Sequence, residues 1–543
     1  MPALRELTDD ALKGLKPEAI AELAQQLLER VRQQALQIGQ QARQIEQRDQ
    51  AIKFKDAKIE KITFELARFK RWRFGARAEA MTAEQRRLFE ETCVEDEADL
   101  QAQLNALQAS LPESAPVQPK RKPRRERLPE HLRRVEHRHE PEDTTCPTPD
   151  CGQPMQRVGE DVSEKLDVVP AEFFVHRHIY GKWACRCCQT LLQQPSELAI
   201  IEGGIPASGL LAHTLISRFV DHLPYYRQES INARSGVCTP RSTLAQWAGQ
   251  AGAALEPLYE AHKAFVLSCG VLHADETPVA LLDPGTGKTK RAYVWGYARG
   301  AFDATPAVVY DFCLGRGAQY PLAFLGQDGQ QGPWTGTLVR DEYAAYDSVV
   351  RAVPGRMAAG CLAHARRKFE ELLRNAGKSA VASQALVQIA AIYRIEREMA
   401  TFSAEDRLDE RRRRTQPLWD QWYKWLLLER QRVPDGSATA KALEYSINSW
   451  QALTRHLLDG QVNVDNNSLE NLLRPWAMGR KAWLFVGSEL AGKRAAIVMS
   501  LVHSARLHGH DPYAWLRDVL DRLPTHLNSR IEELLPHRWQ PAH

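Results

Sequence analysis

The chain has 543 residues, of which 26% are charged and 43% hydrophobic, as in an ordinary globular protein. No run approaches the ~18 consecutive apolar residues of a membrane-spanning helix, and the N-terminus lacks the basic and apolar regions of a secretory signal. These features exclude the membrane and secreted classes and favour a cytoplasmic protein of about three or four domains. The net charge of +4 does not by itself indicate a nucleic-acid partner, and ten cysteines without a signal favour metal sites over disulfides.

Within residues 1–90, an apolar residue recurs at every seventh position from Val31 to Leu66. Polar and charged residues fill the gaps, and no proline occurs between Pro17 and Pro112. This pattern predicts a coiled-coil helix that forms a homodimer or higher oligomer, although a solvated helix folded back on its own chain is the alternative. The run from Phe69 to Arg77 is either a helix end with Gly75 as cap or, through Arg73, a contact to the DNA backbone. The heptad residues are Val31, Ile38, Ile45, Ile52, Ile59 and Leu66.

Residues 91–139 read as a linker that is first acidic and then basic. The segment from Lys120 to His139 holds nine Lys and Arg against three Glu. Charge runs are usually solvated tails, but this one leads directly into a cysteine cluster. We therefore interpret it as a nucleic-acid-binding arm, with Arg124 and Arg125 as contact residues.

Residues 140–200 contain two short-spaced cysteine pairs about 33 residues apart. Cys146 and Cys151 form one pair, and Cys185 and Cys188 form the other. Four thiolates in this arrangement can close one tetrahedral, structural Zn²⁺ site, whereas the alternative is four reduced structural cysteines. The residues between the pairs predict strands with a turn at Tyr180–Gly181, so the prediction is a zinc ribbon.

Residues 201–265 show apolar spacing of three and four, which predicts helices. The piece from Ser235 to Trp247 is similar to the second half of a helix-turn-helix, with a helix that opens at Thr239–Pro240 and carries Arg241. Such an assignment from one sequence is weak, so DNA contact and a plain helical connector both stay open.

Residues 266–376 read as strands followed by a helix. Strands are predicted over 270–282, 291–300, 305–313 and 335–341, and a fifth strand beginning at Gly355 leads into a helix. Three meandering strands and then alternating strand and helix suggest an RNase H-like sheet. Asp275 lies on the first strand and Asp341 ends the fourth. Carboxylates at the ends of adjacent strands suit hard divalent cations such as Mg²⁺.

Two metal ions need a third carboxylate, and Glu470 is the best candidate. Asp465 to Ser468 supply helix-capping side chains, so Glu470 falls in the first turn of a helix. Residues 377–460 predict an all-helical insertion before this acid, in which Arg411 to Arg414 either hold DNA or form a solvated face. Beyond it, Arg480 and Lys481 are candidate DNA-end contacts. Arg474 is a further contact or an ion-pair partner of Glu470. Trp483 either stacks on a base or is buried.

The motifs HADETP, VRDEYAAYD, GCLAHARRKFEEL and VDNNSLENLLRPWAMGRKAWLFVGS closely resemble the insertion-sequence-66 family of bacterial DDE transposases, and the resemblance covers nearly the whole chain. It implies a multidomain α+β protein: a coiled-coil helix, a zinc ribbon, a helical connector, and an RNase H-like α/β catalytic domain with an all-helical insertion. The second catalytic part would span 461–490, followed by a C-terminal helical extension over 491–543. The family often has Gly where this chain has Glu342, and Ala or Arg where it has Leu469.

By the same resemblance, Asp275, Asp341 and Glu470 are the catalytic acids and hold two Mg²⁺ ions, for which Mn²⁺ can substitute. Cys361 and His364 match a Cys-x2-His feature of several such families and would support the active-site helix. The expected partner is double-stranded DNA, both transposon ends and target, with small accessory proteins encoded by the same element. The competing interpretations are a DNA-binding derivative without catalytic activity and another nuclease of the same fold.

Overall fold

The computed structural model describes residues 97–105 and 128–541, with gaps at 129, 131, 142, 146–152, 170–171, 189, 284–285, 287, 328–331 and 377–378, and four residues between 58 and 63. The chain divides into two compact units, residues 1–68 with 103–119 and residues 69–102 with 120–543. The second unit holds nearly all the described residues and is the one discussed below. Most of the predicted heptad helix and of the linker after it lies outside the described residues.

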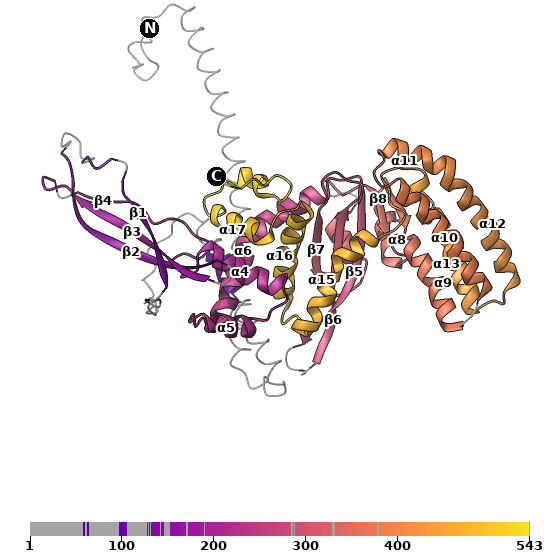
Figure 1. Ribbon diagram of the computed structural model, residues 1–543, viewed down its shortest axis with the longest axis horizontal. Coiled ribbons are helices and arrows are strands. Elements are labelled where there is room, and N and C mark those ends of the chain that lie inside the picture. The colour runs from indigo at the N-terminus through magenta and orange to yellow at the C-terminus, as the bar shows by residue number, and fades with distance from the viewer. Residues whose placement is uncertain are drawn as a thin grey trace, which may run out of the picture. The chain divides into compact units, whose positions relative to one another are not determined.

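A narrow four-stranded sheet begins the well-described part of the chain (Figure 1). β1 is parallel to β3, whereas β2 and β4 are antiparallel to it, and the order is β1-β3-β2 with β4 also on β3. β1 comes from the segment that the sequence placed in the basic linker. Its half-buried and exposed residues alternate, as in a strand with one covered face. The strands are β1 (Arg133–His139), β2 (Gln156–Val169), β3 (Glu172–Ala184) and β4 (Leu191–Gln193).

The turn that the sequence predicted at Tyr180–Gly181 is wrong. Both residues lie inside β3, where Tyr180 pairs with Asp161 and Gly181 pairs with Glu160 of β2. Gly181 instead lies where the Glu140 side chain comes close to the backbone of β3. A Cβ atom at Gly181 would lie 2.4 Å from a carboxylate oxygen of Glu140. β3 therefore runs without interruption from Glu172 to Ala184, directly before Cys185.

Three helices follow and confirm the predicted helical character of this region. α6 opens at Arg241, one residue after Pro240, and its buried residues recur at spacings of three and four. It packs on the central sheet, where the Tyr259 hydroxyl donates to the carbonyl of Tyr310 at 2.7 Å. No helix in the described part of the chain is long and apolar enough to cross a membrane. The helices are α4 (Ser208–Phe219), α5 (Tyr225–Arg234) and α6 (Arg241–Val266).

A five-stranded sheet forms the centre of the unit, in the order β7-β6-β5-β8-β9. β5, β6 and β7 form an antiparallel meander, whereas β5, β8 and β9 are parallel, so all five strands predicted from the sequence are confirmed. α7 precedes β8, and α8 connects it to β9. The elements are β5 (Val271–Asp283), β6 (Lys288–Arg299), β7 (Val308–Cys313), α7 (Gln319–Leu325), β8 (Gly336–Arg340), α8 (Ala344–Arg351) and β9 (Arg356–Gly360).

Helices from the end of the chain cover this sheet. α15 (Asn467–Trp483) packs against β5, and α16 (Glu489–Leu507) packs along the outermost strand β7. The hydroxyls of Ser500 and Ser504 on α16 accept hydrogen bonds from backbone N–H groups of β7, at 2.8 and 3.0 Å. A helix thus satisfies donors that an edge strand leaves open. α17 (Pro512–Arg522) then packs against α4.

Between β9 and α15 the chain is helical, as predicted for residues 377–460, and has a hydrophobic core of its own around Trp419 and Trp422. This core begins earlier than predicted, because Leu362, Phe369 and Leu372 of the helix at 362–376, which the sequence placed in the catalytic core, belong to it. A single π-helical turn joins α11 and α12. The helices are α9 (Leu362–Ala376), α10 (Ala380–Glu398), α11 (Ala404–Glu410), the π turn η2 (Arg411–Thr415), α12 (Gln416–Arg432), α13 (Ala438–Asn448), α14 (Trp450–Leu453) and the 3-10 turn η3 (Arg455–Leu457).

Arg411 lies inside this core rather than on a DNA-binding face. Its side chain is fully buried, pairs with Glu396 through two contacts of 2.7 and 3.0 Å, and donates to the carbonyl of His456. We expect Arg411→Ala to lower the free energy of unfolding by ~3–5 kcal/mol, because it leaves the buried Glu396 carboxylate unpaired.

Chemical denaturation followed by tryptophan fluorescence measures this effect. Arg413→Ala is the matched control, since Arg413 pairs with Glu410 at an exposed position and should leave the midpoint nearly unchanged. Removing both charges in Arg411→Met with Glu396→Leu should restore much of the loss. Equal midpoints for Arg411→Ala and the native chain would contradict the prediction.

Candidate active site

Asp275 and Asp341 come together through the register of two neighbouring parallel strands. Val271 of β5 pairs with Thr337 of β8, and His273 pairs with Val339, a constant offset of 66 residues. Continued two residues beyond the last pair, the same offset would set Asp275 opposite Asp341, the residue that directly follows β8. The two carboxylates are close enough for the charge of Asp341 to raise the pKa of Asp275. A carboxylate oxygen of Asp341 accepts the backbone N–H of Tyr343 at 3.0 Å.

Glu342, where the resembled family often has glycine, does not add an uncompensated charge here. Its carboxylate lies 3.2 Å from a guanidinium nitrogen of Arg340, whose side chain is buried at the end of β8. The same guanidinium reaches the carboxylate of Asp347 at 2.5 Å. The departure from the family pattern therefore leaves Asp341 in place.

Glu470 lies in the first turn of α15, as predicted, but the N-cap residue Asn466 makes no capping hydrogen bond through its side chain. A carboxylate oxygen of Asp465 instead accepts the backbone N–H of Asn467 at 3.1 Å. Its backbone N–H donates to the carbonyl of Asn466 at 3.1 Å. Its side chain contacts two residues of α9, Arg367 at 3.2 Å and His364 at 3.7 Å. The ion-pair partner in this structure is thus Arg367 rather than Arg474, the i+4 residue that the sequence suggested.

The electrostatics of Asp275 show that the acids share one small region. Burial raises the pKa of Asp275 to about 8, and the negative charges of Glu276, Asp341 and Glu470 add to the shift. Such a group favours either a proton or a nearby cation. A divalent cation would supply the positive charge that these carboxylates lack, so the residues present fit Mg²⁺.

Glu276 belongs to the same region and was not singled out from the sequence. Its side chain is 1% exposed, lies 2.5 Å from the guanidinium of Arg316, and accepts the Tyr346 hydroxyl at 2.8 Å. Burial raises its pKa, whereas Tyr346 and Arg316 favour its charged form. The Arg316 guanidinium stacks 3.8 Å above the ring of Tyr343. The only signal in the sequence is that Glu276 directly follows Asp275.

Asn466 connects the strand of one acid to the helix of another. Its side-chain amide donates to the carbonyl of Ala274 at 2.9 Å and accepts from the imidazole of His273 at 2.7 Å. Its backbone N–H lies 3.2 Å from the sulfur of Cys361. Burial raises the pKa of Cys361 to about 12, so this residue is a thiol at neutral pH.

The ligand atoms of Cys361, His364 and Glu470 lie within 4.8 Å of one another. His364 thus faces a catalytic acid, whereas Cys361 contacts the residue that anchors α15. These contacts agree with a supporting role for both residues in the active-site helix.

The candidate DNA-contact residues are scattered over several elements. Arg474, Arg480 and Lys481 are exposed on α15, and a guanidinium nitrogen of Arg480 donates to the carbonyl of Pro278 at 3.0 Å. Arg241 is the first residue of α6. Trp483 is buried against Phe219, so of the two alternatives for this residue, base stacking and burial, the structure shows burial. Arg73, Arg124 and Arg125 lie outside the described residues.

The candidate zinc ligands are described only in part. Cys185 follows β3 directly, Cys188 lies in the turn after it, and both pack in one small cluster with Met155. Two thiols from one tight turn fit half of a tetrahedral zinc site. Cys146 and Cys151, the expected other half, lie outside the described residues.

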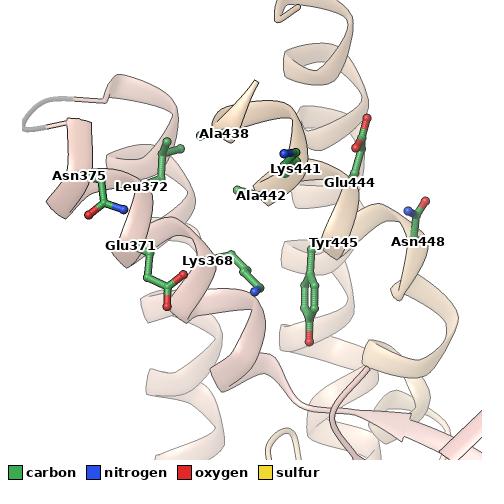
Figure 2. Close-up of a pocket in the computed structure, with 10 residues that line it drawn as sticks. All are labelled: Lys368, Glu371, Leu372, Asn375, Ala438, Lys441, Ala442, Glu444, Tyr445 and Asn448. Carbon is green, nitrogen blue, oxygen red and sulfur yellow. The ribbon is translucent and has the colours of Figure 1, made fainter. Parts of the chain in front are cut away.

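A hollow of about 640 Å³ opens between α9 and α13, on the helical insertion. Figure 2 shows Lys368 and Tyr445 extending towards each other from the two helices, and the ammonium lies 5.5 Å from the ring centre. Burial raises the pKa of the Tyr445 hydroxyl, and the charges of Glu342 and Asp341 raise it further. The hollow therefore lies close to the acidic site.

Four family models match the chain. Residues 203–494 match the transposase IS66 family, and residues 500–537 match the IS66 C-terminal element. Residues 143–189 match the zinc-finger binding domain of transposase IS66, and residues 61–136 match a model described as transposase C of IS166 homeodomain. These matches define a transposase with a zinc finger, and they imply DNA as a partner and zinc as a ligand. The chain belongs to the IS66 transposase family.

Curated relatives occur in Sinorhizobium fredii. The uncharacterized protein y4jD is 38% identical over 429 residues, which are 76% of this chain and 81% of that protein. The uncharacterized protein y4qI is 35% identical over 455 residues, which are 82% of this chain and 83% of that protein. Their descriptions carry no activity, so the chemistry of this chain has to be argued from its own site.

Proposed function

We propose that this protein is a DDE transposase that cleaves transposon-end DNA to free 3′-hydroxyls and joins them to target DNA. The observation that carries the proposal is the meeting of Asp275, Asp341 and Glu470, through the β5–β8 register and the first turn of α15. A meander of three strands followed by two parallel strands is the sheet of an RNase H-like domain, and we assign that fold to residues 266–376 with 461–490.

Asp275, Asp341 and Glu470 would hold the metal ions. Two Mg²⁺ ions held there would supply Lewis acidity for the attacking and leaving oxygens of an in-line displacement. The chain itself contributes position and charge. The buried β5 strand holds Asp275, and the Asp341 carboxylate is oriented by the backbone N–H of Tyr343. Glu276 adds a further negative charge near the site, and the guanidinium of Arg316 pairs with that charge.

Basic residues surround the acids on two helices and would hold the DNA backbone. Arg474, Arg480 and Lys481 lie on α15 beyond Glu470, and Arg366 and Arg367 lie on α9. The hollow lined by Lys368, Lys441 and Tyr445 continues this surface and offers an aromatic ring for an unpaired base (Figure 2). Lysine and arginine contacts to phosphates position a duplex without reading its sequence.

Activity should depend strictly on a divalent cation. We expect a labelled end fragment to be nicked and joined to target DNA in Mg²⁺ or Mn²⁺, and to be bound but not cut in EDTA. Gel electrophoresis of the labelled strands separates binding, cleavage and joining. Binding without cleavage in either metal would contradict the catalytic proposal and favour a DNA-binding derivative.

A further inference from the structure

A cluster of histidines lies on the narrow sheet, away from the cysteine pairs. β1 and β3 run parallel, and their register pairs His137 with His178 and His139 with Tyr180. One nitrogen of His137 lies 2.8 Å from one of His176, and one nitrogen of His139 lies 3.1 Å from one of His178. Side chains with the same parity on two paired strands face the same side, so these imidazoles form a continuous stack.

Glu197 brings a carboxylate to this stack from the segment after β4. One of its oxygens lies 3.5 Å from Nδ1 of His139, and the other lies 4.0 Å from Nδ1 of His178. Its backbone N–H donates to the Tyr180 hydroxyl at 3.3 Å. One ligand atom from each of His139, His178 and Glu197 lies within 4.8 Å of the other two.

We propose that His139, His178 and Glu197 bind a second zinc ion, with water as its fourth ligand, distinct from the zinc expected at the cysteines. Imidazole nitrogens and a carboxylate oxygen bind zinc at roughly 2.0–2.2 Å, and tetrahedral angles then set neighbouring ligand atoms about 3.3 Å apart. One ligand atom from each of the three residues already lies within 4.8 Å of the other two. Rotation of the exposed Glu197 side chain and of the His139 ring would bring these atoms to that separation around the buried His178.

The cluster also has the surroundings of a built metal site. His137 and His176 pack beside the ligands, and His176 contacts the buried carboxylate of Asp167 at 2.9 Å. Carboxylates and imidazoles around the ligands commonly orient metal sites. The cysteine turn is too distant to share the ion, because His178 and Cys185 are seven residues apart on an extended strand, about 23 Å at ~3.3 Å per residue.

The ion would join three segments that are separate in the sequence. His139 ends β1, His178 lies in the middle of β3, and Glu197 belongs to the stretch that leads from β4 towards α4. Among the described residues, this stretch contacts the stack through Glu197, which touches Tyr180, His139 and His178. Zinc at this site would therefore fix the path by which the chain leaves the narrow sheet.

Counting bound zinc tests the proposal. Full-length protein is stripped with a chelator, equilibrated with Zn²⁺ in excess Mg²⁺, passed over a desalting column and measured by mass spectrometry of the metal. We expect two zinc ions per chain in the native protein, and one after His178→Ala or Glu197→Gln. Cys185→Ser should lose the other one, and Cys185→Ser combined with Glu197→Gln should lose both.

Cobalt distinguishes the two sites directly, because only thiolate ligands give intense near-ultraviolet charge-transfer bands. Glu197→Gln should keep these bands and lose one cobalt, whereas Cys185→Ser should lose the bands. Glu172→Gln, an exposed carboxylate on the same β3 strand, is the matched control and should bind as much metal as the native chain. If His178→Ala and Glu197→Gln both bind as much zinc as the native protein, the second site does not exist. A native protein with one zinc, lost on Cys185→Ser, would overturn it equally.

Discussion

Asp275→Asn should abolish strand transfer, with a loss of at least ~10³-fold, or ~4 kcal/mol of transition-state stabilisation. The substitution keeps the size of the side chain and removes the charge that would hold a metal ion between β5 and β8. Binding of the end fragment should be unchanged, because Asp275 is only partly exposed and the candidate phosphate contacts lie on α9 and α15. The measurement is single-turnover joining of a labelled end, alongside a binding titration.

The same variant should stabilise the metal-free protein. The pKa of Asp275 is about 8 in the folded chain and 3.8 in a model peptide, so the folded state holds the proton more tightly than the unfolded state. The stability linked to this proton is fully present below pH ~4 and is lost as the pH rises towards 8. At neutral pH in EDTA, Asp275→Asn should therefore melt at a higher temperature than the native chain, and the difference should shrink on acidification.

Asp283→Asn, at the far end of the same strand, is the control for both measurements. It should change neither joining nor the pH dependence of melting. Full strand transfer by Asp275→Asn would show that Asp275 is not a catalytic residue. A lower melting temperature in EDTA at neutral pH would show that its carboxylate is not repelled by its neighbours.

The central sheet was predictable because its signals are local. Alternation of apolar residues marked β5 to β9. Asp275 within β5 and Asp341 directly after β8 were then expected to lie close together, because neighbouring parallel strands bring equivalent positions together. Glu470 was placed in a first helical turn by its capping residues, but 128 residues separate it from Asp341. Its position beside the sheet rested on resemblance to a family, since no local pattern encodes that packing.

The features that the sequence did not reveal depend on contacts between distant segments. β1 looked like a charged linker because its partner strand begins more than thirty residues later. The histidine stack follows from that pairing and was equally hidden. Gly181 looked like a turn residue, whereas it lies inside β3, where the carboxylate of Glu140 occupies the space beside its Cα. Arg411 looked like part of a basic surface until Glu396 and the π turn placed it inside a core.

Asn466→Ala should lower strand transfer by ~10–100-fold although Asn466 carries no charge, as expected for a residue that orients metal ligands. Its side chain holds the Ala274 carbonyl, next to Asp275, and its own carbonyl accepts the N–H of Glu470. Removing the amide breaks the hydrogen bond that joins the start of α15 to β5. Asp275 and Glu470 are then no longer held in a fixed position relative to each other. The Mg²⁺ concentration for half-maximal joining should rise, and a role in folding alone would not move it.

Asn467→Ala is the matched control for this prediction, because Asn467 is exposed and its side chain contacts only the neighbouring Asp465 in the hydrogen bonds of the described residues. It should leave both the rate and the Mg²⁺ dependence as they are in the native protein. Asn466→Asp keeps an acceptor for His273 but loses the donor to Ala274 and adds a negative charge beside the acids, so it should be at least as impaired as Asn466→Ala. If Asn466→Ala only lowers the melting temperature and joins DNA at the native rate and Mg²⁺ concentration, the connection between β5 and α15 is structural and the acids are held by other contacts.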